Sequence, residues 1–164
     1  MIRAATKADA AEIARVHVAS MRVAYAEHEV LARITLEDRI ARVREALAEG
    51  RRILVTEEDA EIVAFASFGP SRDGDASDEV GEVYAIYAHP SAWGFGVGRR
   101  LIAAATDALR EAGFAEATLW VLGTNDRARR FYERAGWTLD GGTKIEEWLP
   151  GLTQLRYRRS LSDA

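Results

Sequence analysis

Hydrophobic residues recur along this 164-residue chain with two spacings, and the alternation between them predicts an α/β fold. Spacings of three and four residues, typical of amphipathic helices, cover residues 9–23, 35–50, 97–112 and 125–135. Apolar or alternating runs, typical of strands, cover residues 2–5, 52–56, 61–69, 80–88, 116–122, 137–140 and 154–159. The expected order is β-α-α-β-β-β-α-β-α-β-β, within one domain spanning residues 1–164.

Turn-forming residues separate these elements and indicate how the strands pair. The segments around Glu57–Ala60 and Pro150–Gly151 are typical of hairpins, and Gly141–Gly142 is expected in a loop. Hairpins favour a mixed, mostly antiparallel sheet over a doubly wound parallel one. Residues 25–34 form a polar connection, and residues 71–78, rich in Gly, Asp and Ser, are expected to be the most mobile segment.

A glycine-rich segment, Gly94–Arg100, joins the central strand at residues 80–88 to the helix that follows. Glycine lets the backbone approach a ligand closely, and the first turn of a helix carries free N–H groups with a partial positive charge. The segment therefore predicts a phosphate or pyrophosphate site, with a tight turn that binds nothing as the alternative. A P-loop is excluded because the loop has no lysine, and the Gly-x-Gly-x-Gly spacing fits a dinucleotide fingerprint poorly.

Two segments resemble the signatures of the GCN5-related N-acetyltransferases, the GNAT superfamily. Trp93–Gly98 resembles the family's acetyl-CoA pyrophosphate loop, although the family usually has a polar residue where Trp93 stands. Asn125–Trp137 resembles the second signature, Asn-x-x-Ala-x-x-Phe-Tyr-x-x-x-Gly-Phe, and follows in the expected order. Taken alone, Asn125 is also a good helix cap and the apolar residues after it are also a core stripe.

The resemblance implies a GNAT fold, with a mixed, mostly antiparallel sheet of six to seven strands, four flanking helices and a V-shaped cleft at the central strand. It also implies acetyl-CoA as co-substrate, with the pantetheine arm beside the end of the central strand. The cofactor-binding residues that it indicates are Ile86, Tyr87, Ala88, Gly94, Phe95, Gly96, Val97, Gly98, Arg99 and Asn125.

Two residues are candidates for proton transfer. Glu82 is a carboxylate in an apolar strand, where it is costly unless it is used or hydrogen-bonded. The resemblance implies that Glu82 deprotonates the amine through water and that Tyr132 protonates the coenzyme A thiolate. The alternatives are a solvent-facing Glu82 at the start of the strand and a Tyr132 that only packs in the core. Because the chain has no cysteine, direct transfer in a ternary complex is expected.

Acidic and aromatic residues suggest where an acceptor binds. The candidates are Tyr25, Glu27, Glu29, Tyr84 and Trp148. Together with acids in residues 73–79, they would attract a cationic primary amine of a small molecule, although they could also serve only solubility. Trp120 stands where peptide-acetylating relatives usually carry Glu, which disfavours a peptide acceptor. A peptide acetyltransferase, a longer acyl donor and a non-catalytic acetyl-CoA-binding module remain alternatives.

The composition argues against several other functions, namely nucleic-acid binding, metal binding and membrane insertion. The formal net charge is −4, which disfavours broad nucleic-acid binding, and the absence of cysteine excludes thiolate metal sites. The three histidines lack the spacing of a zinc site, so no metal is expected. Neither a membrane-spanning run nor a signal-peptide core is present in this sequence, and a cytoplasmic protein is expected. The sequence leaves open whether the chain forms a homodimer.

Overall fold

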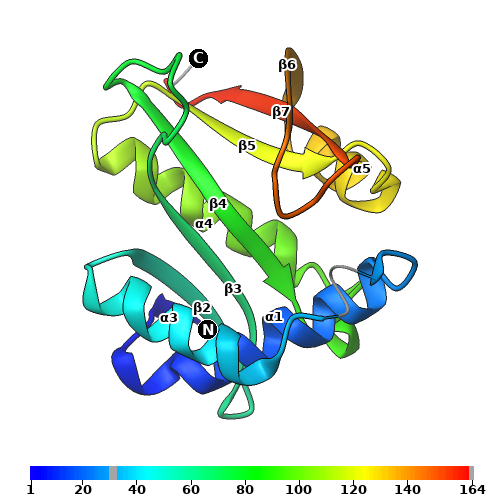
Figure 1. Cartoon of the computed structure of the whole chain (residues 1–164). Coiled ribbons are helices and arrows are strands. Elements are labelled where there is room, and N and C mark those ends of the chain that lie inside the picture. Colours follow the sequence, from blue (N-terminus) through cyan, green and yellow to red (C-terminus); the bar gives the residue numbers. More distant parts are fainter. Residues whose placement is uncertain (30–32, 163–164) are drawn as a thin grey trace. The chain divides into compact units, whose positions relative to one another are not determined.

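The computed structural model describes residues 1–29 and 33–162 (Figure 1). In chain order, its helices and strands are β1 (Ile2–Ala4), the 3-10 helix η1 (Lys7–Asp9), α1 (Ala10–Ala24), α3 (Leu36–Ala48), β2 (Arg52–Glu58), β3 (Glu61–Pro70), β4 (Val80–Ala88), the 3-10 helix η2 (Pro90–Ala92), α4 (Val97–Glu111), β5 (Glu116–Leu122), α5 (Asp126–Arg134), β6 (Thr138–Ile145) and β7 (Thr153–Ser160). Within the described residues, the predicted order of helices and strands is confirmed.

The strands of the described chain form one mixed sheet in the order β1-β2-β3-β4-β5-β7-β6. The pairs β1–β2, β2–β3, β5–β7 and β6–β7 are antiparallel, whereas β4 and β5 are parallel, with Val80–Glu82 paired to Glu116–Thr118. A doubly wound parallel sheet is therefore excluded, as the hairpins predicted. The chain divides into two compact units, residues 1–68 with 85–105 and residues 69–84 with 106–162.

In the first unit, α1 and α3 pack against each other and against β2 and β3. The inner face of α1 carries Ile13 and Val16, which are fully buried, and these residues share one apolar cluster with Val43 of α3 and Phe65 of β3. Burying each such side chain contributes about 1.5–3 kcal/mol relative to leaving it exposed. Unlike the predicted single helix, the segment starts with η1, whose Asp9 carboxylate accepts the backbone N–H of Thr6 at 2.7 Å.

In the second unit, β5, β6 and β7 form an antiparallel ladder, and α5 precedes β6 in the chain. Its largest fully buried side chains are those of Trp137 and Tyr157. α5 begins where the sequence predicts, because the Asn125 side chain accepts the Ala128 N–H at 3.1 Å, and it ends before Gly136, whose φ is +91°. A side-chain cap at one end and a left-handed glycine after the other are strong local signals for a short helix.

Two turns differ from their predicted form. β2 continues to Glu58, so the first hairpin turns on Asp59 and Ala60 alone, both with positive φ, as a tight two-residue hairpin requires. Gly141–Gly142 was expected in a loop but lies within β6, where the pairing with β7 shifts register between Leu139 and Thr143. Glycines inside a strand often mark such an irregularity rather than its end.

Candidate active site

The glycine loop lies in the first unit, between η2 and α4. Gly94 and Gly96 adopt left-handed backbone conformations, with φ of +87° and +77°, whereas Gly98 lies in the first turn of α4 without a positive φ. A Cβ on Gly94 would meet no atom within 4 Å, so the backbone there is open to an approaching group. A Cβ on Gly96 would stand 3.2 Å from Arg100 Nη1. Two of the three glycines are thus required by the backbone itself.

Trp93 anchors this loop to the end of β4. Its indole Nε1 donates a hydrogen bond of 2.8 Å to the carbonyl of Ala88, and the backbone N–H of Trp93 donates to Pro90. Trp93, which departs from the family pattern, therefore has a structural role, because its indole fixes the start of the loop to the end of β4. Sequence reasoning treated this position only as a mismatch.

The two arginines at the end of the loop have different surroundings. Arg100 donates to the Phe95 carbonyl at 3.3 Å and lies 3.9 Å from Glu58, so its guanidinium closes over its own loop. Arg99 is exposed, and the Phe95 side chain is 74% exposed. Val97 is buried at the start of α4, where it holds the helix to the core of the first unit. Backbone N–H groups and Arg99 are therefore the groups available to an anion at this loop.

The end of β4 carries the residues predicted to lie beside the cofactor arm. Ile86, Tyr87 and Ala88 are all half-buried. The Tyr87 ring stacks on His17 of α1 at a centroid distance of 4.3 Å and tilts against Phe65 of β3 at 5.9 Å. Tyr87 is thus held by aromatic contacts from two other elements, and the strand end has a fixed position in the first unit.

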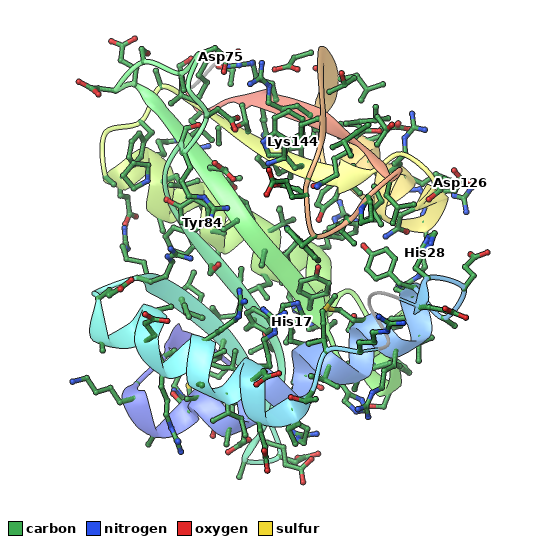
Figure 2. All side chains as sticks on the ribbon, viewed as in Figure 1. His17, His28, Asp75, Tyr84, Asp126 and Lys144 are labelled. Carbon is green, nitrogen blue, oxygen red and sulfur yellow. The ribbon has the colours of Figure 1, made fainter. Side chains whose placement is uncertain are left out.

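Glu82, in the second unit, is buried, which makes the solvent-facing alternative wrong. Its carboxylate accepts the backbone N–H of Arg72 at 3.0 Å and the Arg72 guanidinium at 3.2 Å. The same guanidinium lies over the ring of Tyr84, 4.1 Å from its centroid, and the Tyr84 hydroxyl donates to the Pro70 carbonyl. Figure 2 shows Tyr84 on β4. Glu82 and Tyr84, both predicted site residues, therefore contact the same arginine.

Tyr132 belongs to α5 in the same unit, and Asn125 precedes the first residue of this helix. Tyr132 is buried, edge-on to Phe131 at 5.2 Å and tilted to Tyr157 at 6.1 Å. Asn125 caps the helix, as the simpler interpretation held. Both residues therefore have structural contacts, and their contact with a cofactor stays a prediction.

Sequence reasoning missed the polar network around Tyr157. The Tyr157 hydroxyl accepts a hydrogen bond from Arg129 Nε at 3.1 Å and donates one of 2.8 Å to Glu133. Burial raises the pKa of Tyr157, the Arg129 bond opposes that rise, and the bond to Glu133 adds to it. The phenol therefore stays protonated at neutral pH and holds two charged side chains of α5. A tyrosine at a strand position gave no sequence signal of this role.

The acidic loop at residues 71–78, expected to be the most mobile segment, has ion pairs and hydrogen bonds to the strands of the second unit. Arg156 of β7 lies 3.2 Å from Asp73, binds both carboxylate oxygens of Asp75 at 2.9 Å, and donates to Asp140 at 2.7 Å. Asp73 also accepts the indole N–H of Trp120 at 3.0 Å. These bonds tie the loop to β5, β6 and β7, so two of its acids already have a counter-ion.

The electrostatics of this cluster follow from its pairing. Hydrogen bonding to Arg156 lowers the pKa of Asp75, against a small opposing effect of burial. Burial would raise the pKa of Asp140, but bonds from Gly142 N–H and Arg156 lower it overall. Lys144 stands 4.4 Å from the centroid of the Trp120 ring, and Figure 2 labels it together with Asp75. Trp120, whose identity disfavours a peptide acceptor, is therefore a tryptophan whose ring is contacted by cations.

The remaining acceptor candidates lie at the end of α1 and after β6. Tyr25 is half-buried with its ring tilted to His28 at 6.3 Å, whereas Glu27 and Glu29 are exposed. Trp148 is 55% exposed. Residues 30–32 of the predicted polar connection lie outside the described residues. A role of Tyr25, Glu27 and Glu29 in binding stays a prediction.

In the part of the chain that the structure describes, no helix is long and apolar enough to cross a membrane. Across the same residues, no group of three or more histidine, aspartate or glutamate side chains is placed to hold a metal ion.

The fold defines an α/β protein built on one mixed sheet, with a glycine loop of the kind that holds a phosphate at the start of a helix. A model of the Acetyltransferase (GNAT) family matches residues 11–137, and the chain belongs to this family. The family's name describes acetyltransferases, and one solved relative was determined with acetyl-CoA as its cofactor.

Three similar proteins extend this comparison. A mycothiol acetyltransferase of Sanguibacter keddieii is 37% identical over 116 residues, which are 70% of this chain but only 37% of the relative's length. The L-amino acid N-acyltransferase MnaT of Escherichia coli is 28% identical over 90% of this chain and 88% of its own. The structure of yncA from Salmonella typhimurium, solved with its cofactor acetyl-CoA, is 26% identical, with a TM-score of 0.71 over 100% of this chain and 95% of that one.

Proposed function

We propose that the protein transfers an acetyl group from acetyl-CoA directly to the primary amine of a small molecule within a ternary complex. The glycine loop is the observation that carries the proposal. It combines two left-handed glycines, an open approach at Gly94 and an anchor from Trp93 to the end of β4. The names of two relatives, a mycothiol acetyltransferase and an amino acid N-acyltransferase, support a small acceptor.

The residues at the loop fit a pyrophosphate. Backbone N–H groups at the start of the 15-residue helix α4 point out of its first turn, and the helix dipole favours an anion there. Arg99 is exposed beside them and adds positive charge. When bound, acetyl-CoA supplies an activated thioester. The loop's part in this proposal is to fix the position of that group, which turns transfer into an intramolecular step.

Two side chains handle protons in the proposal. Glu82 accepts the proton of the amine through a water molecule. Arg72 occupies two of the roughly four acceptor positions of this carboxylate and holds its orientation, which leaves positions for water. Tyr132 donates the proton that the leaving thiolate needs, and its contact with Phe131 restricts the ring.

Calorimetric titration with acetyl-CoA tests the loop. Gly96→Asp puts a negative charge and a side chain into the site, and we expect binding to be lost. Gly113→Asp is the matched control, because Gly113 also has a positive φ, +98°, and a Cβ added there would meet no atom within 4 Å, so it carries the same backbone strain away from the loop. Wild-type affinity in Gly96→Asp would refute the assignment.

Release of coenzyme A over a panel of polyamines, aminoglycosides, amino acids and short peptides tests the reaction. We expect turnover of at least one small amine above the rate of thioester hydrolysis. Turnover of peptides alone would show a peptide acetyltransferase. Binding of acetyl-CoA with only hydrolysis for every amine would show a non-catalytic module. Ping-pong kinetics would contradict direct transfer.

A further inference from the structure

Two polar residues of the first unit, His17 and Arg39, have no chemical role in the site described so far. His17 of α1 is buried, stacked on Tyr87 with 29° between the ring planes, and tilted to Phe65 at 5.5 Å (Figure 2). Among residues 1–29 and 33–162, neither ring nitrogen of His17 has a hydrogen bond. Most buried side-chain polar groups in proteins have a hydrogen-bond partner.

Arg39 of α3 is the charged member of the cluster. It is half-buried, and its Nε is fully buried without a hydrogen-bond partner. Within the described part of the chain, no carboxylate lies within ion-pair distance of its guanidinium. Burial, with the nearby charge of Arg42, lowers the pKa of Arg39, whereas Tyr87 acts in the opposite direction. A cation held in this way lacks the anion that such positions normally contain.

The two groups are close enough to influence one another. Burial and, to a smaller extent, the charge of Arg39 together lower the pKa of His17 to about 3. At neutral pH, His17 is therefore uncharged, and the cluster carries the single positive charge of Arg39. A neutral imidazole, an aromatic wall and an unpaired guanidinium form a surrounding that an anion would complete.

The position of this cluster identifies the anion. Tyr87 belongs to the end of β4, where the acetyl donor is expected, so a group bound by Arg39 would be part of the acceptor. The planar guanidinium fork matches a carboxylate in two parallel hydrogen bonds. We propose that Arg39, beside His17 and Tyr87, binds the carboxylate of the acceptor, which makes the acceptor an amine that also carries a carboxylate, such as an amino acid. This inference rests on the proposed function.

A matched pair of substrates tests the inference. L-leucine and L-leucinamide share the amine and side chain but differ in the carboxylate. Arg39→Gln is compared with wild type for each substrate separately, so the different basicity of the two amines cancels. We expect Arg39→Gln to lower kcat/KM for leucine about 10- to 100-fold more than for leucinamide, mainly through KM. Arg39→Lys keeps the charge and should restore part of the loss.

Arg44→Gln is the matched control, because Arg44 is an exposed arginine of the same helix. It removes one positive charge without touching the cluster and should leave the leucine to leucinamide ratio at its wild-type value. Titration of each variant with coenzyme A and a thermal melt show whether it is folded. Equal effects of Arg39→Gln on both substrates, or the same change in Arg44→Gln, would overturn the inference.

A second measurement separates this inference from the proposed function. If wild-type protein turns over neither substrate, the proposed function fails for this class, and calorimetry of L-leucine against the protein saturated with coenzyme A decides the inference. Binding that is lost in Arg39→Gln and kept in Arg44→Gln supports it. If leucine is neither bound nor turned over in a way that depends on Arg39, the carboxylate site does not exist.

Discussion

Acid should destabilise this protein well before its carboxylates are protonated, and His17 is the reason. The folded-state pKa of His17 is lowered to about 3 by burial and by Arg39, against 6.5 for the exposed side chain. Between these two values, the unfolded chain binds one proton more than the folded chain. The free energy of unfolding therefore falls as the pH falls below 6.5, and it is fully restored above that value.

The size of the effect follows from the two pKa values. At pH 4.5, the histidine of the unfolded chain is almost fully protonated and that of the folded chain is not, which lowers the free energy of unfolding by about 2.5 kcal/mol relative to pH 7. The rings of Tyr87 and Phe65 contact His17, the charge of Arg39 acts on it, and Arg42 acts in turn on Arg39, so the charges named around His17 in the described residues are positive. Asp9, whose pKa the Arg3 bond holds at about 2, adds its own loss only below about pH 4.

Urea unfolding at pH 7.0, 6.0, 5.0 and 4.5 measures how steeply the free energy of unfolding falls with pH. We expect His17→Phe, which keeps a ring against Tyr87, to abolish most of it, and His28→Gln, which leaves His17 in place, to keep it. The imidazole signals of His17 in the folded protein should not titrate above pH 4.5 by NMR. A His17 signal that titrates near pH 6.5, or an unchanged slope in His17→Phe, would refute the reasoning.

The remaining predictions concern the second unit. Tyr132→Phe should lower kcat about 10- to 1000-fold and leave acetyl-CoA affinity unchanged, measured by coenzyme A release and calorimetry, and a lost affinity would show a role in binding instead. Arg156→Gln leaves the largely buried carboxylate of Asp73 without its cation, whereas Asp140 keeps its ion pair with Arg158, and the free energy of unfolding should fall by about 1–3 kcal/mol. Chemical denaturation measures this value, and an unchanged midpoint would show that the cluster does not hold the acidic loop.

Local signals made part of this fold predictable. α5 begins and ends where the sequence indicates, because Asn125 caps it and Gly136 follows its last turn. Gly94 and Gly96 have the left-handed conformations that a loop before a helix suggests. In each case, the determining residue and the structure it determines lie within one turn of the chain.

Contacts between distant segments were not predictable in the same way. Arg156 stands 83 residues from Asp73 and 16 from Asp140, so the counter-ion of the acidic loop leaves no mark in the loop's own composition. His17 served in the sequence only to argue against zinc, because nothing near it signals that Tyr87 and Phe65 cover its ring. Trp93 was a mismatch to the family motif in the sequence, and its hydrogen bond to Ala88 explains why a tryptophan stands there.

Local charge therefore matters more here than the net charge of −4. The acids at Asp73 and Asp75, expected to draw in a cationic amine, are already paired with Arg156, whereas Arg39 is a half-buried cation whose Nε has no hydrogen-bond partner among the described residues. An amine must be neutral to attack a thioester, so strong attraction to its charged form would oppose the reaction that it is meant to promote. Holding the acceptor by a carboxylate instead provides binding energy at a group that takes no part in the chemistry, and leaves the amine free to lose its proton.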